Sequence, residues 1–240
     1  MVDNASADGT PAAIRAAWPA VRLVDAGGNL GFAAANNIGI RMSGSEFVLL
    51  LNSDTVVPAG AIDALVQALR LQPDAAAAGP RLVDRNGRTE LSFGRMMGPW
   101  AELRQKTLVG LHARRAPVIS GYVERATRRR RFPDWVSGAC LLVRRADALA
   151  AGLLDERYFL YAEDVDFCAA LRGLGRRILF TPDAEIVHLR GASRRARPAE
   201  TERAYRRSQL AFYAKHHPRW ARVLGAYLRV RGKLPPDTGF

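Results

Sequence analysis

Short apolar runs alternate with amphipathic segments along the chain, and polar or glycine-containing turns separate them. The clearest run is Phe47–Leu51, five consecutive apolar residues between polar neighbours. A continuous run of this length is typical of a central parallel strand that is buried on both faces. Further strands are predicted at residues 21–24, 76–83, 135–143, 178–180 and 186–188.

Helical patterns occupy most of the stretches between these strands. Pro11 to Trp18 begins with Thr10 as a helix N-cap and with proline at the first helical position. Other helices are predicted at residues 32–42, 59–71, 145–151 and 163–174, and from Pro198 onward. Strands that alternate with helices predict a layered α/β fold with a largely parallel sheet.

Residues 84–133 lack a clear period, and we expect irregular structure there. The segment contains two basic clusters, Arg114–Arg115 and Arg128–Arg131. It is interpreted either as a solvated insertion or as a loop that faces an acceptor or a membrane.

Charge is concentrated near the C-terminal end. The chain has 240 residues, 48% of them hydrophobic, and a net charge of +13. Residues 194–240 contain 12 basic and 3 acidic residues, so most of the excess lies there. Such a surface suits nucleic acid, an anionic membrane or a phosphate-bearing substrate, although arginine usage can also reflect genome composition.

Neither a signal peptide nor an apolar run long enough to span a bilayer is recognised. Cys140 and Cys168 lie in apolar surroundings without metal-ligand spacing, and we expect buried, reduced thiols. These features predict a protein that acts in the cytoplasm or on the cytoplasmic face of the membrane.

Two groups of polar residues follow predicted strands or begin a helix. Asn52, Ser53 and Asp54 end the apolar run, where ligands bind in open α/β sheets, and their oxygens could hold a divalent cation. An Asx turn or a helix cap is the alternative. Glu163, Asp164 and Asp166 begin a helix between aromatic residues. The helix dipole favours one or two acids there, but three partly buried acids point to a general base.

Two further features are candidates for binding. His188 ends a predicted strand and could be either structural or a ligand of a nearby cation. Gly28 to Asn37 places glycines and paired amides at a helix start, where backbone N–H groups can approach a phosphate or a sugar. Tight packing of the helix start is the alternative.

Six ordered blocks between residues 2 and 193 together resemble glycosyltransferase family 2, in particular its rhamnosyltransferase-like branch. The blocks are Val-Asp-Asn-Ala-Ser-x-Asp-Gly, Asn-Leu-Gly-Phe-Ala-x-x-Asn-Asn, Leu-Leu-Leu-Asn-x-Asp-Thr, Gly-Ala-Cys-Leu-Leu-Val-Arg-Arg, Leu-Asp-Glu-x-Tyr-Phe-Leu-Tyr-x-Glu-Asp-Val-Asp and His-x-x-Gly-x-Ser.

The resemblance implies a GT-A fold, a Rossmann-like three-layer sandwich with a mostly parallel central sheet. It places this domain at residues 1–193, with the insertion at about 84–133 and a basic helical extension at 194–240. It also implies an inverting hexosyltransferase that uses Mn²⁺ or Mg²⁺.

The resemblance also assigns roles to residues of this chain. Asp164 would be the catalytic base, and Asp54 and His188 would hold the metal. Residues on the donor side would be Asp3, Asn4, Asn29, Gly31, Asn36, Asn52 and Ser53. Residues on the acceptor side would be Trp135, Gly138, Ala139, Glu163 and Asp166.

The implied reaction moves a sugar, with rhamnose as the candidate, from a TDP- or UDP-sugar to a glycan or polyprenyl-linked acceptor in surface polysaccharide synthesis. The basic, aromatic-containing tail would dock peripherally on the inner face of the plasma membrane. Nucleic acid is not an expected partner, because acids concentrate at the candidate site and no binding module is recognised.

Two departures from the family pattern bear on these expectations. The metal motif begins with Asn52 instead of an aspartate, and the family's first strand and helix, roughly 35 residues before Val2, are absent from this sequence. An open sheet edge beside Val2 is therefore expected. The alternative interpretation is a truncated, non-catalytic chain that binds a sugar nucleotide or a protein partner.

Overall fold

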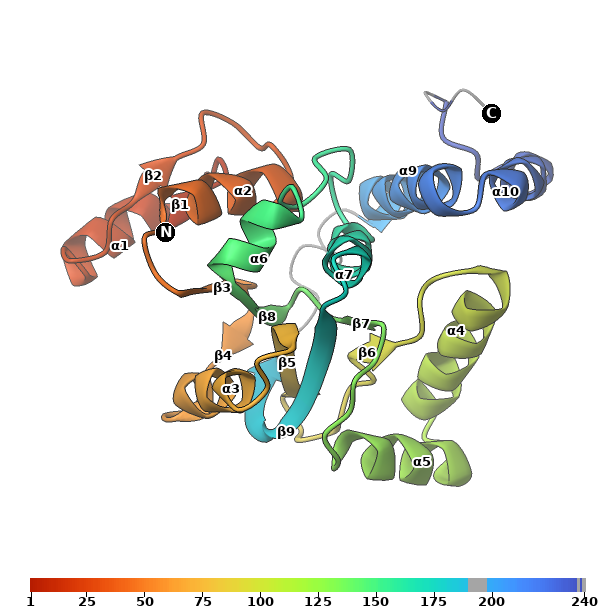
Figure 1. The fold of residues 1–240 in the computed structure, drawn as a ribbon. Helices are drawn as coiled ribbons and strands as arrows, with labels where there is room; N and C mark the ends of the chain where they lie inside the picture. Colours follow the sequence, from red (N-terminus) through yellow and green to blue (C-terminus); the bar gives the residue numbers. More distant parts are fainter. Residues whose placement is uncertain (190–197, 237, 239–240) are drawn as a thin grey trace.

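The computed structural model describes residues 1–189, 198–236 and 238 of the chain, and Figure 1 shows its elements. The predicted boundary at residues 193 and 194, and Gly191 and Ser193 of the last sequence block, lie outside these residues.

A small parallel sheet stands at the N-terminal end. β1 (Val2–Asp3) pairs with β2 (Val24–Asp25), and α1 (Thr10–Ala17) connects them. The predicted strand at residues 21–24 is therefore shorter and lies later, and Gly9 instead of Thr10 caps α1. α2 (Phe32–Met42) follows with the predicted bounds.

The main sheet has five strands in the order β3-β8-β5-β9-β4. The strands are β3 (Phe47–Leu51), β4 (Thr55–Val56), β5 (Ala75–Val83), β8 (Cys140–Arg144) and β9 (Arg177–His188). β5 and β9 pair in parallel, and β8 is antiparallel to both β3 and β5. β3, β5 and β9 thus point the same way and β8 and β4 run against them, so three of the five strands share one direction.

β3 lies at an edge of this sheet, so the prediction of a central strand is wrong. In the described residues β3 pairs with β8 alone and β1 pairs with β2 alone. Only Leu50 of β3 is fully buried. The apolar run nevertheless has a physical reason, because Val48 packs on one face of the sheet and Phe47 and Leu49 on the other.

Helices cover both faces of the main sheet, as the three-layer prediction requires (Figure 1). α3 (Ala61–Arg70) buries Leu65 and Leu69 against one face. α2, α6 (Arg145–Ala150) and α7 (Glu163–Gly173) cover the other face, with Phe167 at the centre of their core. β8 shows the pattern clearly, since Leu141 and Val143 pack on one side and Leu142 on the other. Burial on both faces explains its unbroken apolar sequence.

The segment 84–133 is largely helical, so the prediction of irregular structure is wrong. It contains α4 (Pro99–Ala113) and α5 (Pro117–Thr127), both with proline in the first helical turn. β6 (Phe93–Gly94) pairs with β7 (Trp135–Val136) and returns the chain to the sheet. No described residue of α4 is buried, so α4 has no apolar stripe from which sequence reasoning could detect it.

The C-terminal extension forms two helices, α9 (Pro198–His216) and α10 (Pro218–Val230). α9 is attached to the rest of the molecule through two carboxylates, the buried Asp166 and the half-buried Glu102. Asp166 of α7 accepts from Lys215 Nζ at 2.8 Å and lies 2.6 Å from His216 Nε2. Glu102 of α4 accepts from the Tyr205 and Tyr213 hydroxyls at 2.9 and 2.8 Å and from Gln209 at 2.6 Å.

Replacing Lys215 with methionine should therefore destabilise the protein by about 1–3 kcal/mol, because the buried Asp166 loses a charged hydrogen-bond partner. Lys233→Met is the matched control, since Lys233 lies 3.8 Å from Glu202 on the surface, where an ion pair contributes roughly 0–1 kcal/mol. Urea unfolding of both variants measures the difference, and equal losses would contradict an anchoring role for Lys215.

Both cysteines are buried and unpaired, as predicted. Burial raises the pKa of each thiol to about 12. Among the described residues, no helix combines the length and the apolar character that are needed to cross a bilayer.

Candidate active site

The turn after β3 lies beside the loop that precedes β8. The Asn52 backbone N–H donates to the Ala139 carbonyl at 3.0 Å. Asn52 in turn accepts through its carbonyl from the Thr55 hydroxyl at 2.7 Å, which closes a tight turn around Ser53 and Asp54. Ser53 is exposed and Asp54 is half-buried. The turn thus carries two oxygen-bearing side chains next to the Gly138–Ala139 loop.

Asp54 and His188 approach each other across the β4–β9 pair. Thr55 lies opposite His188 in the ladder, and the Leu189 N–H donates to the Asp54 carbonyl at 2.8 Å. Asp54 Oδ1 is 3.4 Å from His188 Nε2. On the other side of the ring, His188 Nδ1 is 3.2 Å from Glu90 Oε2. With the proton on Nδ1, the ring donates to Glu90 and leaves the Nε2 lone pair facing Asp54.

Asp164 lies against the Gly138 loop at the start of α7. Its Oδ2 accepts from the Gly138 N–H at 2.8 Å, and its Oδ1 accepts from the Val165 N–H at 2.8 Å. A Cβ at Gly138 would be 3.1 Å from Asp164 Cβ, so the close approach favours glycine there. Burial raises the pKa of Asp164, and the two N–H donors oppose that shift.

Glu163 is buried beside Asp164 but lacks its donors. Its Oε2 has no hydrogen-bond partner among the described residues. Burial, together with the negative charge of Asp164, raises the pKa of Glu163. When one proton is shared between the two acids, it therefore resides on Glu163, and Asp164 is the ionised member of the pair.

The backbone before α7 is strained. Tyr161 and Ala162 both have positive φ, at 69° and 68°, a conformation that residues with a Cβ rarely adopt. Strain of this kind often marks a functional site. The positive φ angles of Tyr161 and Ala162 turn the chain, so that α7 begins with Glu163 and Asp164.

The Asn4 side chain organises the glycine loop before α2. Its Oδ1 accepts from the Leu30 N–H at 2.8 Å, and its Nδ2 donates to Asn29 Oδ1 and to the Gly31 carbonyl, both at 3.2 Å. Asp3 is buried and accepts from the Ser6 N–H at 3.2 Å. Asn36 donates to the Phe32 carbonyl at 2.8 Å. Asn4, Asn29 and Gly31 therefore form one hydrogen-bonded group, Asp3 precedes it in the chain, and Asn36 lies on the helix that follows.

This loop reaches the region of Asp164. The Phe32 N–H donates to the Phe159 carbonyl at 3.0 Å. Gly31 has φ +84°, and a Cβ there would lie 2.5 Å from that carbonyl oxygen, so only glycine fits. The Phe32 ring approaches Gly138 as well, at 3.6 Å from the position of a Cβ. Donor-side and acceptor-side segments thus converge on Gly138.

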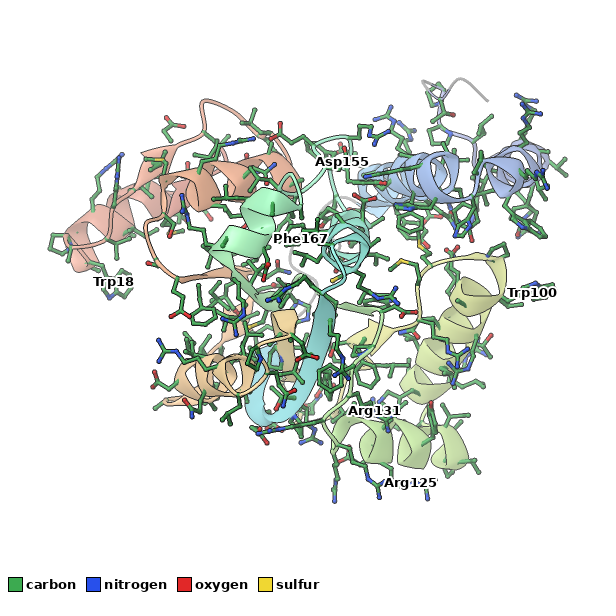
Figure 2. The ribbon with its side chains drawn as sticks, in the orientation of Figure 1. Trp18, Trp100, Arg125, Arg131, Asp155 and Phe167 are labelled. Carbon is green, nitrogen blue, oxygen red and sulfur yellow. The ribbon has the colours of Figure 1, made fainter. Side chains whose placement is uncertain are left out.

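Two residues predicted on the acceptor side, Trp135 and Asp166, have side chains bound to other parts of the molecule and not to Asp164. Trp135 packs over Gly94 and donates through Nε1 to the Arg95 carbonyl at 2.8 Å. Asp166 is directed to α9 and to the Tyr158 hydroxyl, so the structure separates its carboxylate from that of Asp164. Asp166 therefore does not join Glu163 and Asp164 in one acidic cluster, because Tyr158, Lys215 and His216 bind its carboxylate. Figure 2 shows the surroundings, with Asp155, which also accepts from Lys215, close to α9.

Sequence reasoning missed two residues that shape the site. Glu90 is 98 positions from His188 along the chain and lies in a segment predicted to be irregular. Asn37 is buried and both donates to and accepts from the Leu154 backbone, which ties α2 to the loop before Asp164. The sequence shows Asn37 as one of two adjacent amides, Asn36 and Asn37, but it does not show that Asn37 binds the backbone of Leu154.

A divalent cation fits the Asp54–His188 pair. One carboxylate oxygen and one imidazole nitrogen face each other, and Glu90 holds the far side of the ring, which is the usual support for a metal-binding histidine. In the described part of the chain, no three acidic, histidine or cysteine side chains gather into a complete cation site. Further ligands would have to come from a bound diphosphate or from water.

The layered α/β domain, with helices on both faces of its main sheet, has the GT-A fold. The fold is shared with solved structures, among them a mannosyltransferase from Pyrobaculum calidifontis in complex with GDP-Man and Mn²⁺ (TM-score 0.58, 20% identity, 94% of this chain and 58% of that one). GalNAc-T7 with UDP, GalNAc and Mn²⁺ is also similar (TM-score 0.56, 14% identity, 87% of this chain and 41% of that one). The chain therefore spans less than two thirds of these structures.

Residues 1–222 match the family described as glycosyltransferase like family 2, and the chain belongs to that family. It is 35% identical over 257 aligned positions to the N-acetylglucosaminyl-diphospho-decaprenol L-rhamnosyltransferase of Mycobacterium tuberculosis, an alignment that covers 98% of this chain and 83% of that protein. A shorter match, 36% over 55 residues, covers 23% of this chain and 21% of the rhamnosyltransferase WbbL of Escherichia coli. The chain is a glycosyltransferase.

Proposed function

We propose that this chain is an inverting, metal-dependent rhamnosyltransferase whose catalytic base is Asp164. The observation that carries the proposal is the asymmetry at the start of α7. Asp164 accepts two backbone N–H bonds, and the adjacent Glu163 has a buried oxygen without a partner. A carboxylate with a raised pKa, which two N–H donors favour in its ionised form over the adjacent acid, suits proton abstraction from a hydroxyl.

The proposed step balances as a single displacement. The Asp164 carboxylate takes the proton from an acceptor hydroxyl, and the hydroxyl oxygen forms a bond to the anomeric carbon. The bond between that carbon and the diphosphate oxygen breaks on the opposite face, which inverts the configuration. The nucleoside diphosphate leaves with the bonding electron pair, and the proton stays on Asp164. In its neutral form, Glu163 would donate a hydrogen bond to the acceptor.

Asp54 and His188 are the proposed metal-binding residues, with Asn52 and Ser53 beside the diphosphate. A bound Mn²⁺ or Mg²⁺ would offset the negative charge that develops on the leaving diphosphate. In this proposal Asp3 and Asn4 would contact the nucleoside, and Asn29, Gly31 and Asn36 would complete the donor side. The hydrogen-bonded group around Asn4 supports one continuous donor site.

The substrates follow from the relatives. The Mycobacterium tuberculosis relative is named for transfer of L-rhamnose to N-acetylglucosaminyl-diphospho-decaprenol. We infer that this chain takes a TDP- or UDP-sugar, with rhamnose the favoured sugar, and a polyprenyl-linked acceptor in surface polysaccharide synthesis. The reaction is placed at the cytoplasmic face of the plasma membrane, where such a lipid would be held.

Thermal stabilisation by a panel of nucleotide sugars, with and without Mn²⁺, tests donor binding. We expect one donor to raise Tm only when the metal is present, because ligands that bind the folded state stabilise it by mass action. Stabilisation by no donor would contradict the proposal and would favour a chain without turnover. Asp63→Asn, a change at an exposed acid of α3, is the control for nonspecific metal effects.

Replacing Glu90 with glutamine should weaken metal binding by roughly 10- to 100-fold, because the His188 ring loses the charged partner that orients it. The measurement is the concentration of free Mn²⁺ by electron paramagnetic resonance, at a fixed concentration of nucleoside diphosphate. Asp63→Asn serves again as the matched control. Unchanged Mn²⁺ affinity in the Glu90 variant would exclude an orienting role for this carboxylate.

A further inference from the structure

Helix α10 carries two opposite apolar faces. Ala221, Gly225 and Leu228 are buried, and Ala221 packs with Phe212 and Tyr213 of α9. The second apolar group points outward, and its members are 45 to 88% exposed: Trp220, Val223, Tyr227 and Val230. The spacing of three, four and three residues places them in one stripe along the helix.

The beginning of α4 adds to this exposed apolar surface. His217, the residue that caps α10, lies with Nε2 2.8 Å from the Met97 carbonyl just before α4. Trp100 lies three residues after Met97, and Trp220 lies three residues after His217. Trp100 is 76% exposed. In Figure 2, Trp100 points away from the body of the molecule, from the end of α4 nearest α10. Two tryptophans therefore flank the α4–α10 junction.

The charges along α10 are all of one sign. Residues 218–233 contain five basic residues and no acid. Within the described residues, Arg219, Arg222 and Arg231 form no ion pair, so their charges are available. Arg219 lies four residues before Val223 and Arg231 lies four residues after Tyr227, so both neighbour the stripe on the helix surface.

We propose that the outward face of α10, together with the start of α4, docks on an anionic phospholipid surface. Helices that lie in a membrane interface combine exposed tryptophan and aliphatic residues on one face with arginine or lysine beside them. Tryptophan and tyrosine prefer the headgroup level, and cations near the surface are attracted to anionic lipid. The absence of acids from residues 218–233 matches this partner.

Docking in this way would place the acceptor side of the site near the lipid. The Ser208 hydroxyl of α9 donates to the Leu160 carbonyl at 2.7 Å, and the rings of Tyr161 and Tyr205 lie 5.9 Å apart. Leu160 and Tyr161 directly precede Glu163 and Asp164. This positioning of the acceptor rests on the proposed function, whereas lipid binding itself does not depend on the reaction.

Sedimentation of the full chain with vesicles tests the proposal. We expect binding to vesicles of phosphatidylcholine with 30% phosphatidylglycerol, on the order of tenfold or more above binding to phosphatidylcholine alone, and a decrease at high salt. The triple variant Arg219→Gln, Arg222→Gln, Arg231→Gln should lose about a hundredfold in affinity. Replacing three exposed arginines elsewhere, Arg15, Arg85 and Arg125, by glutamine is the matched control.

Trp220→Ala with Tyr227→Ala should also weaken binding by at least about tenfold, since each buries apolar area in the interface. Trp18→Ala, at the exposed residue that follows α1, should not weaken binding. Equal binding to neutral and anionic vesicles, or full binding by the triple variant, would overturn the proposal. A dimer on size exclusion that Trp220→Ala disrupts would assign the stripe to a second copy and would also overturn it. Transfer to a short, water-soluble acceptor reports on the proposed function separately, because it requires no vesicle.

Discussion

Replacing Asp164 with asparagine is expected to lower kcat by roughly a hundredfold to ten-thousandfold, the usual contribution of a general base. Asparagine has nearly the same shape, and its side-chain oxygen can still accept from the Gly138 N–H. It cannot take a proton from the acceptor hydroxyl. Donor binding, measured by the metal-dependent rise in Tm, should therefore be preserved while turnover is lost.

The pH dependence of the rate gives an independent check. Burial raises the pKa of Asp164 above the ordinary range of an aspartate. A base must be deprotonated to act, so activity should be low at acidic pH and should rise through that elevated pKa. Asp164→Asn should remove this rise. If Glu163→Gln abolished turnover and Asp164→Asn did not, the two roles would have to be exchanged.

The second large effect is expected at Asp54. Asp54→Ala should lower kcat by about a hundredfold or more, since one well-placed electrostatic group contributes ~3 kcal/mol to transition-state stabilisation. Removal of the metal by a chelator should lower the rate of the parent protein in the same way. It should have little further effect on the variant, because both changes remove the same interaction.

Asp63→Asn is the control for Asp54→Ala, because Asp63 is an exposed acid in the first turn of α3. Initial rates at saturating acceptor, with donor and Mn²⁺ each varied, separate a loss of metal affinity from a loss of turnover. Full activity of Asp54→Ala at low Mn²⁺ would contradict the assignment of this carboxylate to the metal.

The parts of the site that the sequence predicts are those built from neighbours along the chain. The Asn52–Asp54 turn follows an apolar strand, and the acids at 163 and 164 begin a helix, so both are visible as local patterns. The ordered blocks also relate the chain to its family, which the match over residues 1–222 confirms. Local pattern and family resemblance together therefore predicted the fold.

Contacts between distant segments could not be predicted in this way. Glu90 supports His188 from a segment with no readable period, and the charge of Asp166 is matched by Lys215 some 49 residues later. Both arrangements depend on how the layers pack. The position of β3 at the sheet edge has a similar origin, because an apolar run reports burial of its two faces and not the presence of strands on both sides.

Helices α4 and α10 show two further limits of prediction from the sequence. α4 buries no described residue, so its sequence lacks the apolar stripe that marks a helix in a core. α10 has apolar residues on two faces, and the sequence cannot tell which of them is buried. Only the structure separates Leu228, in the core, from Val230, on the surface.

The most direct test of the account is transfer itself. The purified chain would be incubated with TDP-L-rhamnose, Mn²⁺ and an N-acetylglucosaminyl-diphospho-polyprenol, and the lipid product followed by mass spectrometry. We predict a product that is heavier by one rhamnosyl residue, formed by the parent protein and by Asp63→Asn and lost in Asp164→Asn. Equal product formation by Asp164→Asn, or no transfer of any sugar by a folded chain that binds its donor, would contradict the account.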